Sequence, residues 1–85
     1  MRRPLALALA WYALIPPMAG EVVNARAPLA QWEQMRAFDT AEECEKVVTA
    51  YAAKMTGQTD NAARARYRQV QYVRCIHASD LRLRP

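Results

Sequence analysis

The stretch FDTAEECEKVVTAYAAKMTG, residues 38–57, decides the fold because it contains a complete helix with its start and stop signals. Thr40 followed by Glu43 is a capping box, in which the threonine oxygen accepts a backbone N–H and the glutamate supports the first turn. Gly57 is the residue type that ends helices in the left-handed conformation. Apolar residues recur between these signals at steps of three and four: Ala41, Cys44, Val47, Val48, Tyr51, Ala52 and Met55. We expect a helix from about Thr40 to Thr56 with this stripe facing the core.

Three segments outside this helix have the composition of β-strands. They lie near residues 11–16, 30–38 and 69–77. The segment 59–68 is rich in alanine and arginine and fits either a short helix or a flexible crossing. This order predicts an α+β domain with one helix packed on a small antiparallel sheet of about three strands, stapled by one disulfide. We expect five side chains to be substantially buried: Trp11, Trp32, Val47, Tyr51 and Val70.

Composition and charge exclude several classes of protein. The chain has 85 residues, enough for one small domain, and only two Cys and two Gly. Multi-bridge scaffolds, four-cysteine zinc sites and glycine-rich phosphate loops are therefore excluded. The formal net charge of +4 is uneven, because residues 1–20 and 61–85 are basic and residues 21–60 are acidic. Without residues 1–20, the balance argues only weakly for a nucleic-acid partner.

The first residues have the pattern of a secretory signal. A short basic region, Met1-Arg2-Arg3, precedes an uninterrupted apolar run from Leu5 to Ile15. This run is about half as long as a transmembrane helix requires, so we expect no integral membrane span. The other interpretation of the run is a buried strand.

Two cleavage sites compete. Cleavage after residue 10 leaves a short apolar region, which suffices if translation starts upstream of Met1. Cleavage after residue 25 gives a complete apolar region but removes Trp11 and Tyr12. We expect residues 1–10 to be a signal-like segment and residues 11–85 to form a single domain with a flexible basic C-terminal tail. Both sites stay open, with a cytosolic protein as the third alternative.

The two cysteines predict a disulfide. Cys44 lies on the inner face of the predicted helix and Cys75 in a later strand, so a bridge between them would close a long loop. Such a bridge would stabilise the fold by roughly 3 to 4 kcal/mol. One alternative is a pair of buried thiols in a cytosolic protein. Another is a metal site completed by His77 and Asp80. The signal-like start favours the disulfide, because disulfides persist in oxidising compartments, and we expect neither a metal nor a cofactor.

Catalytic side chains are sparse. Ser79 and His77 are two positions apart, and on a strand they would lie about 7 Å from each other, too far for a nucleophile and its base. The acidic cluster Glu42, Glu43 and Glu45 is explained by the helix start, where the dipole favours negative charge. We therefore expect the protein not to be an enzyme.

Four arginines form the candidate surface for an anionic partner: Arg64, Arg66, Arg68 and Arg74. Guanidinium groups neutralise phosphates, and the interspersed Tyr67 and Tyr72 could stack on bases. The simpler interpretation is a solvated surface. Nucleic acid is the less favoured partner of an exported protein, whereas an anionic membrane surface or an acidic protein would use the same arginines.

The chain contains four distinctive patches: Trp11-Tyr12 with Pro16-Pro17, Ala27-Pro28-Leu29 with Trp32, the helix start from Phe38 to Glu45, and Arg74-Cys75-Ile76 with Ser79-Asp80. Together these patches resemble a group of small exported bacterial proteins. The resemblance implies export and a helix-to-strand disulfide, and it implies no activity.

The favoured function is a small exported, non-catalytic interaction or structural protein of the bacterial envelope, periplasmic or secreted. Its expected partner is another envelope protein or an anionic surface. The alternative is a cytosolic, basic nucleic-acid-binding module that uses the arginines of residues 64–74.

Overall fold

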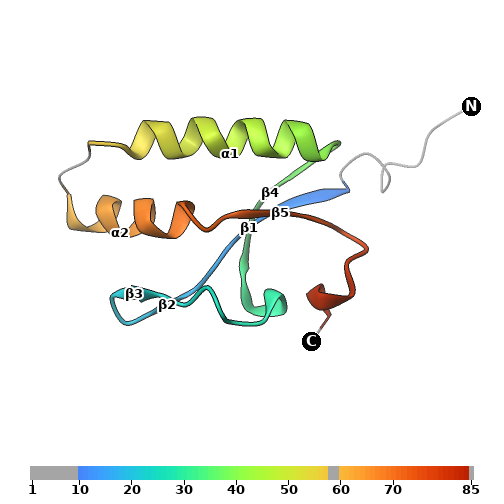
Figure 1. Ribbon diagram of the computed structural model, residues 1–85, viewed down its shortest axis with the longest axis horizontal. Coiled ribbons are helices and arrows are strands. Elements are labelled where there is room, and N and C mark those ends of the chain that lie inside the picture. The colour runs from blue at the N-terminus through green and yellow to red at the C-terminus, as the bar shows by residue number, and fades with distance from the viewer. Residues whose placement is uncertain (1–9, 58–59, 85) are drawn as a thin grey trace, which may run out of the picture.

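Figure 1 shows the computed structural model, which describes residues 10–57 and 60–84. The predicted signal-like segment lies outside these residues except for Ala10. The chain folds as an α+β domain, which confirms the expected class. Its strands, α-helices and 3-10 helices (η) follow in this order: β1 (Trp11–Ile15), β2 (Met18–Ala19), β3 (Val22–Val23), η2 (Leu29–Gln31), β4 (Glu33–Phe38), α1 (Ala41–Met55), α2 (Asn61–Val70), β5 (Arg74–His77) and η3 (Leu81–Leu83). Within the described residues, no helix is both long and apolar enough to cross a membrane.

β1 is the middle strand of a three-stranded antiparallel sheet with the order β4-β1-β5. Trp11 pairs with Phe38 on one side and with His77 on the other. The register with β4 shifts in the middle of β1, which leaves Met35 as a bulge. A separate hairpin of β2 and β3 turns at Gly20, whose φ of +66° is the left-handed conformation that glycine adopts without strain.

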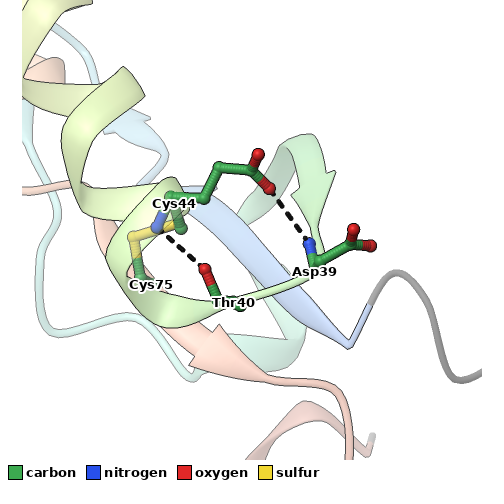
Figure 2. The surroundings of a disulfide bond; sticks show 5 residues. Asp39, Thr40, Cys44 and Cys75 are labelled. Carbon is green, nitrogen blue, oxygen red and sulfur yellow. Dashed lines mark hydrogen bonds between the residues drawn. A yellow bond between two sulfur atoms is a disulfide. The ribbon is translucent and has the colours of Figure 1, made fainter.

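α1 begins and ends at the predicted signals. The Thr40 hydroxyl accepts a hydrogen bond from the Glu43 backbone N–H at 3.1 Å, and the Glu43 carboxylate accepts one from the Asp39 backbone N–H at 3.3 Å (Figure 2). The reciprocal bond therefore reaches one residue before the N-cap. Gly57 follows the helix with a φ of +86°. The cap, the helix and its stop confirm the prediction for this segment.

Each face of the sheet has its own small core. On the face covered by α1, the buried core residues are Ala13, Phe38 and Cys44. On the opposite face they are Leu14, Leu29, Trp32 and Ile76. Segments from η2 and η3 cover this second face, and Leu83 of η3 packs against it where a flexible tail was expected.

Two strand predictions need correction. Of the strand expected over residues 69–77, only β5 is a strand in the structure. Residues 69 and 70 form the end of α2. Asp60 caps that helix by accepting from the backbone N–H of Ala62, and Val70 is buried at its end. The strand expected over 30–38 begins later, because a 3-10 turn precedes Trp32. Of the segment that fitted either a helix or a crossing, residues 61–68 are helical, and Figure 1 shows α2 running antiparallel to α1.

The expected core residues divide into two groups. Trp32 and Val70 are buried, with 8% and 2% of their surfaces exposed. Trp11, Val47 and Tyr51 are only half-buried. Val47 and Tyr51 belong to the same face of α1, so this helix leaves part of its apolar stripe accessible.

Candidate functional site

An apolar groove of about 310 Å³ lies between the edge strand β4 and helix α1. We call it the β4 groove. Its apolar lining consists mainly of Met35, Phe38, Val47, Val48, Tyr51 and Val73. The half-buried part of the α1 stripe therefore forms one wall of a groove, and this explains why α1 is incompletely covered.

The bulge at Met35 determines which side chains of β4 surround the groove. Glu33 pairs with Ile15, and Arg36 pairs with Ala13. Ile15 and Ala13 are two positions apart, so they lie on the same face of β1, the face that α1 covers. The extra residue therefore brings Glu33 and Arg36 to the same face, although a spacing of three would place them on opposite faces of a regular strand.

The rim of the groove carries two guanidinium groups and one carboxylate. Arg66 of α2 has its Nη1 3.8 Å from the Glu33 carboxylate and donates to the Gln69 side chain at 3.5 Å. Gln69 in turn donates to the backbone carbonyl of Pro16 at 2.9 Å, which ties α2 to the end of β1. Arg36 lies over the Phe38 ring at 5.0 Å from its centroid, in a cation–π contact. One positive charge at the rim is therefore left without a carboxylate.

The four arginines of the predicted surface do not all lie on the same side of the molecule. Arg64 and Arg68 are four positions apart and share one side of α2, whereas Arg66 is turned about 200° from Arg64 and meets Glu33. Arg74 lies in β5 opposite Leu14, on the sheet face that α1 does not cover. The structure thus brings two of the four arginines together and separates the other two.

The prediction that His77 and Ser79 cannot touch is wrong. The His77 Nδ1 and the Ser79 hydroxyl lie 2.8 Å apart, and the Ser79 backbone N–H donates to the same Nδ1 at 3.1 Å. The strand spacing does not apply, because β5 ends at His77 and the chain turns there. Accepting the backbone N–H requires an unprotonated Nδ1, so the neutral ring carries its proton on Nε2.

This contact has the form of a local turn motif. Both residues are exposed, and the His77 ring packs edge-on against Trp11 at 5.1 Å between centroids. In a catalytic triad a third side chain holds the second ring nitrogen of the base. None of the described residues forms a hydrogen bond with Nε2 of His77. The pair is therefore better explained as a side-chain cap on the turn than as a nucleophile and its base.

Cys44 and Cys75 form the predicted disulfide, with their Cα atoms 6.1 Å apart (Figure 2). The bridge joins the first turns of α1 to the edge strand β5. Because both cysteine sulfur atoms are in the bridge, they are not thiolate ligands for the alternative metal site with His77 and Asp80. In the part of the chain that the structure describes, no group of three or more metal-ligating side chains is present.

Sequence reasoning did not identify the β4 groove. The one sequence signal for this groove is that Met35 falls out of phase with Trp32 and Phe38. This break in the alternation indicates the bulge. The charged rim depends on contacts between distant segments, which no local pattern reveals. Comparisons of the chain with protein-family models, curated proteins and solved structures gave no match. Function is therefore inferred from the residues and their geometry.

Proposed function

We propose that the protein is a small exported, non-catalytic interaction protein of the bacterial envelope, and that the β4 groove holds an extended segment of its partner. The observation that carries this proposal is the combination of an apolar groove with an edge strand. Among the described strands, β4 pairs only with β1. An added strand can form main-chain hydrogen bonds with such an edge while its alternate side chains enter the groove.

The rim charges favour a particular kind of segment. Arg36 and Arg66 outnumber the single carboxylate of Glu33. A partner segment with apolar residues alternating with Asp or Glu would complement both the lining and the rim. The bulge at Met35 interrupts the flat edge, so it disfavours indiscriminate pairing with other strands.

Two observations support export. The disulfide is of a kind that persists in the periplasm and outside the cell and is rare in the cytosol. The basic and apolar start of the chain supports a signal. Cleavage after residue 10 keeps the middle strand β1, whereas cleavage after residue 25 removes it, so we favour the earlier site.

Fractionation followed by N-terminal sequencing of the mature chain tests the location. We expect a periplasmic or secreted chain that begins at Trp11. A cytosolic chain with free thiols would contradict the proposal. It would favour the nucleic-acid alternative if the protein also bound RNA or DNA with steep salt dependence.

Site-specific photo-crosslinking tests the groove. A photoreactive phenylalanine analogue replaces Tyr51 inside the groove and, as the matched control, Val22 on the hairpin, a residue that is 68% exposed. We expect the Tyr51 probe to capture an extended segment rich in apolar and acidic residues and the Val22 probe to capture none. Equal capture at both positions, or no capture at Tyr51, would contradict the proposed site.

A further inference from the structure

A second hollow, of about 410 Å³, lies on the sheet face opposite α1. Two arginines from different segments line it, Arg74 of β5 and Arg82 of η3. Trp32, Leu29 and Pro28 supply its apolar wall. We call it the Arg74–Arg82 hollow. It is separate from the β4 groove, and the two share no lining residue.

Asp80 fixes the position of Arg82. The Arg82 Nε and Nη2 donate to the two carboxylate oxygens at 3.1 and 2.8 Å, and the Arg82 backbone N–H donates to the carboxylate at 2.9 Å. This two-point contact holds the guanidinium plane and leaves Nη1 outside the pair. An arginine that is already oriented loses less conformational entropy when it binds an anion.

The hollow carries one uncompensated positive charge. The hydrogen bonds from Arg82 lower the pKa of Asp80 to about 2, and the charge of Arg74 contributes a smaller lowering. Asp80 is therefore ionised at neutral pH and neutralises one of the two guanidinium groups. No described carboxylate lies within ion-pair distance of Arg74. The site thus matches a ligand with a single negative charge.

The wall beside the charges is apolar and rigid. Trp32 is held by a hydrogen bond from its indole N–H to the backbone carbonyl of Ala27 at 2.8 Å. Leu29 is buried next to it in the same core cluster. The hollow, of about 410 Å³, is large enough for a small organic ligand.

We propose that the Arg74–Arg82 hollow binds a carboxylate attached to a small apolar group, such as the C-terminal residue of a peptide. Arg74 and the Nη1 of Arg82 take the carboxylate, and the apolar group lies against the wall of Pro28 and Trp32. This binding is independent of the β4 groove. It therefore holds whether or not that groove has the function proposed above.

The test titrates N-acetyl-leucine into the full-length, disulfide-bonded protein and follows the Trp32 indole N–H by NMR. We expect a saturable shift with a Kd of about 1 to 10 mM, typical of a ligand of a dozen atoms. The double variant Arg74→Gln/Arg82→Gln should weaken binding at least about tenfold. The control Arg64→Gln/Arg68→Gln loses the same charge elsewhere and should bind as the parent does.

The double variant also breaks the Arg82–Asp80 pair and could disturb η3. The single variant Arg74→Gln avoids this, because Arg74 is not part of that pair. It should also weaken binding, with an unchanged melting temperature. If the Arg64→Gln/Arg68→Gln control weakened binding equally, the effect would come from the net charge of the protein, and the proposed site would be refuted. Equal binding of N-acetyl-leucinamide would remove the role of the carboxylate, and equal binding of inorganic phosphate would remove that of the apolar group. The absence of a saturable shift up to about 100 mM would also overturn the proposal.

Discussion

Removing the disulfide should cost the domain most of its stability. Cys44 and Cys75 are 31 positions apart, and the chain-entropy treatment assigns about 3.7 kcal/mol to a loop of that length. A domain of about 75 residues has a folding free energy of about 4 to 11 kcal/mol. Two small core clusters place this protein near the lower end of that range. The variant Cys44→Ala/Cys75→Ala should therefore lose about 3 to 5 kcal/mol, because a cavity beside Phe38 adds to the entropic loss.

Urea denaturation followed by tryptophan fluorescence measures this loss. The comparison uses the oxidised protein, the same protein with reductant, and the double alanine variant. Thr49→Ala, at an exposed position of α1, is the control and should not lower the unfolding free energy, because Ala favours the helix more than Thr does. Mass measurement after alkylation establishes the oxidation state of each sample. A loss below about 1 kcal/mol in both reduced and alanine forms would refute the reasoning, because the bridge would then not constrain the unfolded chain.

Thr40→Ala removes the cap of α1 and should lower the unfolding free energy by about 1 kcal/mol in the same assay, whereas no measurable loss would show that the cap is dispensable. The pKa of Asp80 is lowered to about 2 from 3.8, so its contribution to stability should be fully present above about pH 4 and lost as the pH falls through about 2. An NMR titration of its carboxyl carbon checks the midpoint, and Asp80→Asn should remove this part of the acid sensitivity. A chain that starts at residue 26 lacks β1 and should show no cooperative unfolding by circular dichroism; a cooperative transition would contradict the role of β1 as the middle strand.

Local signals predicted α1 and its bridge. The cap at Thr40, the apolar stripe and the stop at Gly57 all lie within one short stretch, and each acts on its immediate neighbours. With only two cysteines in the chain, Cys44 can form an intramolecular disulfide only with Cys75. The helix could be predicted because no distant contact is needed to specify it, and the bridge because two cysteines allow only one intramolecular pairing.

The wrong predictions concern features that depend on distant contacts or on where a helix or strand ends. The end of α2 at Val70 was predicted as strand, because Val and Tyr favour strands and the burial that stabilises the helix end is tertiary. The His77–Ser79 contact depends on β5 ending at His77. The separation of Arg66 from Arg64 follows from helix geometry once α2 is known, but its pairing with Glu33 requires the three-dimensional structure.

The position of β1 in the sheet has a consequence for folding kinetics. β1 precedes both of its neighbours in the chain, and the later one, β5, contains Cys75. The sheet therefore cannot close until residues 74–77 have been synthesised, and such non-local pairing is slow. Until then the apolar strand WYALI keeps an unpaired edge that can join other chains. Nascent chains that stall before residue 74 should accordingly depend on chaperones, because β1 then lacks its partner β5.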